Sequence, residues 1–201
     1  PVYFLNTGFH FPETIQFKND IAEKLKLEVI DLESPVSKFS QRDPQGRFYF
    51  ASNPDYCCYL NKVLPMEPVL KSKDVWIAGV RADQNANRAG MSEEIKGKYD
   101  TLRYHPILDW SSKMVYDYRM AYDLPPHSLE AKGYLSIGCE PCTQSFLDQQ
   151  NSDARNGRWA GMKKSECGLH VELVGKETED EVKVKVKVEV KVKVEGNQGK
   201  A

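Results

Sequence analysis

The chain has 201 residues, of which 40% are hydrophobic and 28% are charged. This composition is typical of a folded globular domain and excludes a fibrous or membrane-embedded class. Its 28 basic and 29 acidic side chains leave a formal net charge of −1, so the overall charge does not favour binding to nucleic acid or to an anionic membrane.

The first 32 residues predict a strand, a helix and a second strand. An apolar run at 2–5 is followed by Pro12 and Glu13, which favour a helix start. Apolar residues then recur at roughly helical spacing up to Lys26, and a strand-like segment occupies 28–32. Because the connection is too long for a hairpin, the pattern predicts a βαβ unit and a parallel sheet.

The middle of the chain predicts the rest of an α/β domain over residues 1–123. Residues 33–55 are typical of a long loop or a broken helix and precede a helix at 56–64. A third, buried strand is predicted at 74–80. The polar segment 81–88 then lies at the carboxyl end of that strand, where open α/β sheets bind ligands. A strand at 102–108 and a helix at 111–122, capped by Ser111, complete the domain.

Two segments of different character follow. Residues 124–175 are punctuated by glycine and proline and predict a loop-rich segment that carries function. Residues 176–201 are low in complexity, with Val alternating with Lys or Glu, and we interpret them as a non-catalytic extension. The longest apolar runs are far shorter than the roughly 20 residues of a membrane span, and no signal peptide is evident. We therefore expect a cytoplasmic protein.

The five cysteines form two close pairs and one single residue, namely Cys57 with Cys58, Cys139 with Cys142, and Cys167. Without a signal peptide, such pairs favour metal or redox chemistry over disulfides. Adjacent side chains on a helix diverge by about 100°, which suits two corners of a cluster better than one ion. We therefore predict a [4Fe–4S] cluster on the two pairs, with zinc as the alternative.

Cys167 lies beside a glycine near the end of the varied sequence, where we expect a mobile thiol. Nearby basic side chains would favour its thiolate, which is the reactive form. These side chains are Arg155, Arg158, Lys163, Lys164 and His170. From the residues alone, the hypothesis that Cys167 is a nucleophile and the hypothesis that it is a spare thiol are equally well supported.

Further cations stand where a small anion would need them. Lys62 follows Cys58 by one helical turn, and Arg81 and Arg88 flank the loop after the third strand. Guanidinium groups match phosphate and sulfate oxygens in two-point contacts. With the arginines before Trp159, the pattern predicts a site for a small anionic nucleotide.

Five segments taken together resemble the assimilatory adenylyl-sulfate (APS) reductases and the related phosphoadenylyl-sulfate (PAPS) reductases. They are CC at 57–58 with Lys62, GVRADQ at 79–84, GYLSIGCEPCT at 133–143, RNGRW at 155–159 and ECGLH at 166–170. The resemblance extends in order from about Val2 to His170. It implies a Rossmann-like α/β domain of the adenine-nucleotide α-hydrolase type, with a loop-rich catalytic C-terminal segment.

The resemblance also implies a reaction and a site. Cys167 is expected to attack the sulfur of adenylyl sulfate and release AMP, after which thioredoxin or a similar dithiol frees sulfite from the S-sulfocysteine. The implied [4Fe–4S] ligands are Cys57, Cys58, Cys139 and Cys142. The residues placed around the substrate are Leu5, Thr7, Lys62, Gly79, Arg88, Arg155, Arg158 and His170.

The sequence departs from the family at one point. The family's Ser-Gly-Gly-x-Asp-Ser phosphate loop is absent, so we expect a longer natural chain and a domain here without its first strand–helix unit. The cysteine pairs favour APS, because the PAPS-preferring branch typically lacks them; a PAPS reductase or an inactive cluster-binding module are the alternatives. A tRNA-thiolation enzyme would need strongly basic surfaces, which the charge argues against. Homo-oligomer formation and the dithiol donor stay open.

Overall fold

The computed structural model describes residues 1–145, 147, 157–159, 162, 164, 166–171 and 173. Over these residues the chain has the α/β fold that the sequence predicts. The predictions for Arg155 and for the tail at 176–201 lie outside the described residues.

The N-terminal βαβ unit is confirmed. Strand β1 (Val2–Asn6) leads into helix α1 (Pro12–Leu25), which ends where Lys26 takes a left-handed backbone conformation. Strand β2 (Val29–Glu33) then pairs with β1 in parallel. Pro12 stands in the first turn of α1, where its missing N–H costs no hydrogen bond.

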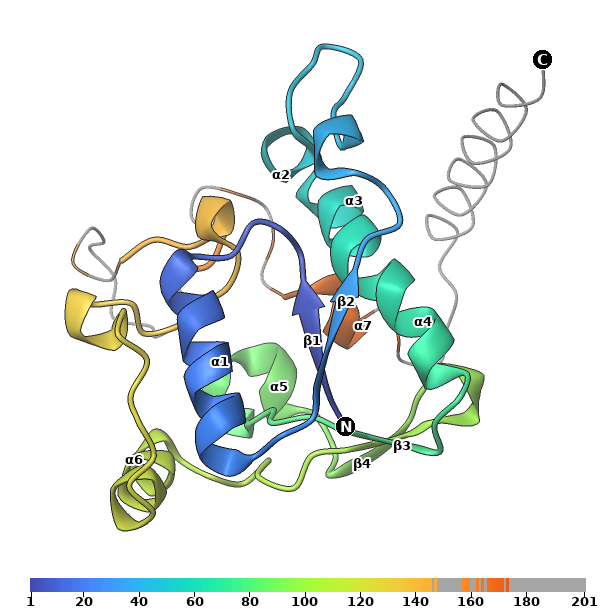
Figure 1. The fold of residues 1–201 in the computed structure, drawn as a ribbon. Coiled ribbons are helices and arrows are strands. Elements are labelled where there is room, and N and C mark those ends of the chain that lie inside the picture. The colour runs from blue at the N-terminus through green and yellow to red at the C-terminus, as the bar shows by residue number, and fades with distance from the viewer. Residues whose placement is uncertain are drawn as a thin grey trace.

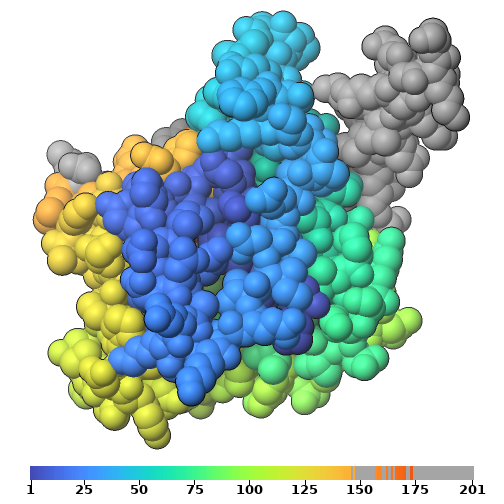
Figure 2. All heavy atoms as spheres, in the orientation of Figure 1, coloured from blue at the N-terminus to red at the C-terminus, as the bar shows by residue number. Residues whose placement is uncertain are grey.

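A helical segment follows β2 and is longer than the predicted helix at 56–64. Its parts are the 3₁₀ turn η1 (Lys38–Ser40), α2 (Tyr49–Ser52), α3 (Pro54–Cys58), the π turn η2 (Tyr59–Val63) and α4 (Leu64–Leu70). In Figure 1, α3 and α4 follow one another beside β2. Figure 2 shows the light-blue segment between β2 and α3 protruding from the body.

A second, three-stranded sheet contains β3 (Val75–Ile77), β4 (Glu94–Lys96) and β5 (Leu102–Tyr104) in the order β3-β5-β4. Strand β3 is parallel to β5, whereas β4 is antiparallel and was not predicted. The prediction of a buried strand at 74–80 is wrong in length and in burial. Val75 and Ile77 are 49% and 67% exposed, so the described residues leave this face of β3 largely uncovered.

The remaining elements are short. They are η3 (Ala82–Gln84), α5 (Ala86–Ala89), η4 (Lys98–Asp100), α6 (Ser112–Ala121), η5 (Glu130–Lys132), η6 (Glu140–Cys142) and α7 (Gly168–Val171). Ser111 caps α6 as predicted, accepting a hydrogen bond from the backbone N–H of Met114 at 3.2 Å. Among the described residues, every helix is too short or too polar to span a bilayer.

The main hydrophobic core lies along η2 and α4. Its buried members are Tyr59, Leu60, Val63, Met66, Leu70 and Leu173. Leu173 comes from the C-terminal segment and is completely buried. This segment is therefore anchored in the body of the domain, next to the helix that carries the first cysteine pair.

Candidate active site

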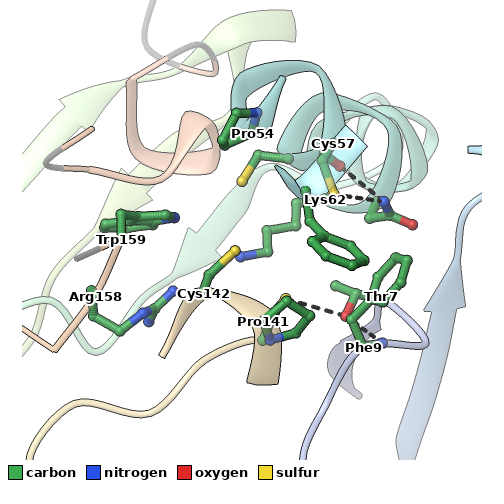
Figure 3. A pocket seen from close by; sticks show the side chains of 13 residues that line it. Thr7, Phe9, Pro54, Cys57, Lys62, Pro141, Cys142, Arg158 and Trp159 are labelled. Atoms are coloured by element: carbon green, nitrogen blue, oxygen red, sulfur yellow. Dashed lines mark hydrogen bonds between the residues drawn. The ribbon is translucent and has the colours of Figure 1, made fainter. Parts of the chain in front are cut away.

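One cavity is lined by both cysteine pairs (Figure 3). Cys57 and Cys58 come from α3, whereas Cys139 and Cys142 come from the turn η6 and the residue before it. The polar side chains that complete the lining are Thr7, Asn61, Lys62 and Arg158. The fold thus brings together two cysteine pairs that are far apart in the sequence.

The helical segment places Lys62 among the cysteines. Asn53 caps α3 by accepting a hydrogen bond from the N–H of Tyr56 at 3.1 Å. In the following π turn, Leu60 and Val63 are each only 1% exposed because they face the core. Lys62 is half-buried between them, and Figure 3 shows its side chain extending across the cavity toward Cys142.

The loop after β1 fastens the second cysteine pair. The backbone N–H of Glu140 donates to the carbonyl oxygen of Phe9 at 2.7 Å, and Cys139 forms an isolated β-bridge with His10. The hydroxyl of Thr7 lies 3.3 Å from the sulfur of Cys139. Thr7 is 4% exposed, so this contact is inside the protein.

The cavity opposes free thiolates. Burial raises the pKa of Cys57 to about 12, and Cys139 and Cys142 add to the shift while Lys62 opposes it. Burial also raises the pKa of Cys142. Burial alone would lower the pKa of Lys62, but the negative charge of surrounding cysteines outweighs it and raises that pKa above its ordinary value. Thiolates here therefore need compensating positive charge, which Lys62 supplies in part.

The donor set of this cavity consists of four thiols, which are ligands suited to zinc and to an iron–sulfur cluster. Within the described part of the chain, no three His, Cys, Asp or Glu side chains are arranged to hold one metal ion. A zinc site gathers its sulfur ligands at about 2.3 Å from one ion, whereas a [4Fe–4S] cluster takes one thiolate at each of four irons.

Arg158 presents an unsatisfied donor at this cavity. Its Nη1 donates to the carbonyl oxygen of Ile137 at 3.3 Å, and its guanidinium lies 4.5 Å from the centre of the Trp159 ring. Its Nε is buried and has no hydrogen-bond partner among the described residues. A Cβ at Gly138 would lie 2.3 Å from the Arg158 Cζ, so the close approach depends on glycine. A bound anion would satisfy this donor.

Cys167, for which the sequence context predicts a mobile thiol, is buried in the structure. It is 8% exposed and packs with Cys58 and Trp159 in one buried cluster. The side chains of Cys58 and Cys167 are in contact, and as long as Cys58 keeps its proton, this contact lowers the pKa of Cys167. Lys62 lowers the pKa of Cys167 further. The surroundings therefore favour its nucleophilic thiolate.

Arg88 and His170, both expected around the substrate, are held by other side chains. Arg88 forms a buried ion pair with Glu166, with 2.8 Å between its Nε and the carboxylate. The His170 ring lies parallel to that of Trp76, with the ring centres 6.5 Å apart, and its Nδ1 shares a hydrogen bond with Arg103. Neither Arg88 nor His170 lines the cysteine cavity.

Arg103 was missed by sequence reasoning. Its side chain is fully buried in β5, its guanidinium lies over the Trp76 ring at 4.6 Å, and its Nε and Nη1 have no partner within the described residues. Burial lowers the pKa of Arg103 to about 10, and nearby Arg88 adds to the shift. A single arginine in a three-residue strand belongs to no motif, so the sequence contains no signal for it.

The other predicted site residues that the structure describes fall into two groups. Thr7, Lys62 and Arg158 join the four paired cysteines at the cavity. Leu5 lies in β1 and Gly79 just beyond β3, and neither lines the cavity. Asn61, whose Nδ2 lies 3.6 Å from the sulfur of Cys57, was also missed.

Comparison with known proteins identifies a family. Residues 1–145 match the family model described as phosphoadenosine phosphosulfate reductase domain. The adenosine 5′-phosphosulfate reductase of Salinibacter ruber is 36% identical over 171 residues, covering 85% of this chain and 68% of the relative. The adenosine 5′-phosphosulfate reductase of Chelativorans sp. is 39% identical over 172 residues, covering 85% of this chain and 69% of the relative. The phosphoadenosine 5′-phosphosulfate reductase of Gloeobacter violaceus is 35% identical, with 84% and 71% coverage.

Solved structures support the fold. A phosphoadenylyl-sulfate reductase from Candida auris superposes with a TM-score of 0.59 at 22% identity, covering 69% of this chain and 68% of that one. The FMN adenylyltransferase of Candida glabrata superposes with a TM-score of 0.55 at 15% identity, covering 92% of this chain and 61% of that one. At these identities the likeness shows a shared fold alone.

Proposed function

The chain belongs to the phosphoadenosine phosphosulfate reductase family, and on this premise we propose that it reduces adenylyl sulfate to sulfite and AMP through an S-sulfocysteine on Cys167. Membership of the family by itself supports reduction of either APS or PAPS, without a choice between the two substrates. The observation that supports the finer proposal is the placement of Cys167. Its sulfur is buried against Cys58 beside the cavity, where the positive charge of Lys62 acts to lower the pKa of the thiol.

The first step is a displacement at sulfur. The Cys167 thiolate forms a bond to the sulfonyl sulfur, the bond from that sulfur to the phosphate oxygen breaks, and its electron pair leaves with AMP. Negative charge grows on the leaving phosphate oxygen. Cations near the phosphosulfate lower the barrier by stabilising that charge. The unsatisfied Nε of Arg158 and the ammonium of Lys62 are suited to this role.

The second step needs a dithiol, and we propose thioredoxin or a similar protein. One of its thiolates attacks the Cys167 sulfur, and sulfite leaves with the electron pair of the sulfur–sulfur bond. The second thiol then closes the partner's disulfide and releases Cys167 as a thiolate. The dithiol loses two electrons and the sulfonyl sulfur gains them. Covalent capture thus divides one difficult reduction into two displacements.

We further propose that Cys57, Cys58, Cys139 and Cys142 hold a [4Fe–4S] cluster. Four thiols around one cavity, with Lys62 and Arg158 in its lining, form a suitable donor set for an anionic cluster. When bound, the cluster supplies a fixed charge and a rigid support beside the substrate rather than electrons. Lys62 balances the negative charge of the thiolates, and Thr7 and Asn61 contact the sulfurs of Cys139 and Cys57.

The decisive test separates the two steps. Adenylyl sulfate is mixed with the protein without a reductant, and mass spectrometry measures the S-sulfonated chain; thioredoxin is then added and sulfite is measured. Wild type should show both products. Cys167→Ser should show neither and should keep its metal content. If wild type forms no S-sulfocysteine from either APS or PAPS, the reading as an inactive cluster-binding module replaces this proposal.

A further inference from the structure

We propose that Glu166, held by Arg88, positions Cys167 for its attack on the substrate. The inference rests on the proposed function, because it assigns a role to two residues in the first displacement. In this role Glu166 and Arg88 are positioning residues. They fix the backbone that carries the nucleophile.

Both oxygens of the Glu166 carboxylate accept hydrogen bonds, from donors in two separate parts of the chain. Its Oε2 accepts from the Arg88 Nε at 2.8 Å and from the Asn85 Nδ2 at 3.0 Å. Its Oε1 accepts from the Arg88 Nη2 at 3.0 Å and from the backbone N–H of Cys167 at 2.9 Å. The same carboxylate therefore connects the nucleophile's own backbone to helix α5.

Arg88, the partner of Glu166 in this ion pair, is also held by hydrogen bonds. Asn85 caps α5, its Oδ1 accepting from the backbone N–H of Arg88 at 2.9 Å, and Gln84 accepts from the Arg88 Nη1. The Arg88 and Glu166 side chains are only 7% and 3% exposed. A two-point Arg–carboxylate contact fixes orientation as well as distance. Because the pair is buried, removing either charge would leave the other uncompensated.

The contacts of Arg88 are directed mainly at this role. Three of its five N–H groups are engaged inside the protein, by Glu166 at Nε and Nη2 and by Gln84 at Nη1. The positioning role of Glu166 rests on these bonds and on its bond to the Cys167 backbone, and it is independent of any further contact that Arg88 makes.

The segment is also held on the far side of Cys167. His170 stacks parallel to Trp76, and Leu173 is completely buried in the main core. Helix α7 packs against α3 and the π turn η2. Cys167 thus lies between two anchors, and the Glu166–Arg88 pair is the anchor next to it in the sequence. Losing that anchor frees the nucleophile while the rest of the fold remains.

The test compares Glu166→Gln, Arg88→Lys and their double variant with wild type. The matched control is Glu130→Gln, because Glu130 accepts two hydrogen bonds from Arg119, at 2.8 and 2.9 Å, away from the site. Single-turnover formation of S-sulfocysteine gives the rate of the first step, and AMP binding gives nucleotide affinity. Both single variants should slow the first step about 10²-fold, as expected for a misplaced nucleophile, with AMP affinity unchanged. The double variant should be no slower than either single one.

A second readout does not depend on substrate turnover. Iodoacetamide labels exposed thiols, and peptide mass spectrometry reports the labelling of Cys167. Glu166→Gln should raise that labelling rate about tenfold over wild type and Glu130→Gln, because opening exposes the buried sulfur. If the Gln variant does not fold, the apolar pair Arg88→Met with Glu166→Leu removes both charges and the bond to Cys167. That pair should show the same slow first step and fast labelling.

The outcomes that contradict the inference are distinct. If Arg88→Lys weakens AMP or substrate binding while Glu166→Gln changes neither rate nor labelling, then Arg88 binds substrate directly and the positioning role is wrong. Labelling of Cys167 that is equal in all variants also overturns it. If wild-type protein forms no S-sulfocysteine, the proposed function fails instead, and the labelling experiment alone decides whether Glu166 holds Cys167 in place.

Discussion

The side chains of Cys167 and Cys58 are both buried and pack together against Trp159. The proposed nucleophile and a proposed cluster ligand are therefore direct neighbours. Their contact connects the C-terminal segment to the cysteine cavity, so chemistry at one thiol alters the electrostatics of the other.

The first prediction concerns the metal. Protein purified without oxygen should contain about four iron and four acid-labile sulfide per chain, as a cluster with four cysteine ligands requires. Cys142→Ser should lose most of this iron, because it removes one ligand at the cavity. Cys167→Ser is the matched control and should keep it. Zinc in place of iron in the anaerobic protein would contradict the cluster assignment and weaken the preference for APS.

The second prediction concerns Arg158. Gly138→Ala places a methyl group 2.3 Å from the present position of the Arg158 Cζ, so the guanidinium has to move. The affinity for adenylyl sulfate should fall about tenfold, because a charge-assisted hydrogen bond is lost. Gly90→Ala is the control, since nothing lies within 4 Å of its added Cβ. Calorimetric titration gives both affinities, and equal values for the two variants would exclude Arg158 as an anion contact.

The third prediction concerns substrate choice. The relatives include enzymes named for APS and for PAPS, so their names leave the substrate undecided. This chain has both cysteine pairs, and the resemblance associates them with APS. Sulfite release with thioredoxin should therefore be faster with APS than with PAPS at equal concentration. Much faster turnover of PAPS would reverse the assignment.

The fourth prediction concerns pH and His127. Its Nδ1 accepts from the backbone N–H of Leu129 at 3.2 Å, and its Nε2 lies 3.2 Å from the hydroxyl of Thr14 in α1. Burial lowers the pKa of His127 below its ordinary value near 6.5. The unfolded chain then binds the proton more tightly, so the stabilisation is present above about pH 6.5 and is lost as pH falls toward the lowered folded pKa.

Urea unfolding between pH 5 and pH 8 measures this effect. His127→Gln removes the titrating group, so its free energy of unfolding should depend less on pH than that of wild type. His105→Gln should also depend less on pH than wild type, because burial lowers the pKa of His105 as well. A His127→Gln profile that runs parallel to wild type would show that His127 does not titrate on unfolding.

Local sequence patterns were sufficient for some elements. The βαβ unit was predicted because an apolar run, a proline at the helix start and helical spacing are all short-range signals. The capping of α6 by Ser111 was predicted from a short-range signal of the same kind. The burial of β3 was predicted wrongly, because the exposure of Val75 and Ile77 depends on what covers the strand and not on its own residues.

The arrangement of the site depends on long-range pairing. Thr7 and Cys139 are 132 positions apart, and Arg88 and Glu166 are 78 positions apart. The motifs identified the cysteines, Lys62 and Arg158 as a group, but no spacing in the sequence indicates that Arg88 bonds to Glu166. The same holds for Arg103, whose contact with Trp76 depends on the pairing of β5 with β3 and whose contact with His170 exists only once the C-terminal segment has docked.

The burial of Cys167 has a consequence for turnover. If a protein dithiol reduces the S-sulfocysteine as proposed, it has to reach a sulfur that is only 8% exposed here, and the segment would then have to detach after the first step and return before the next. Because the segment stays covalently attached, its return is intramolecular and does not depend on enzyme concentration. Docking that is too strong delays reduction, and docking that is too weak delays sulfonation. In the proposed cycle, the free energy of docking therefore has an optimum between these two extremes.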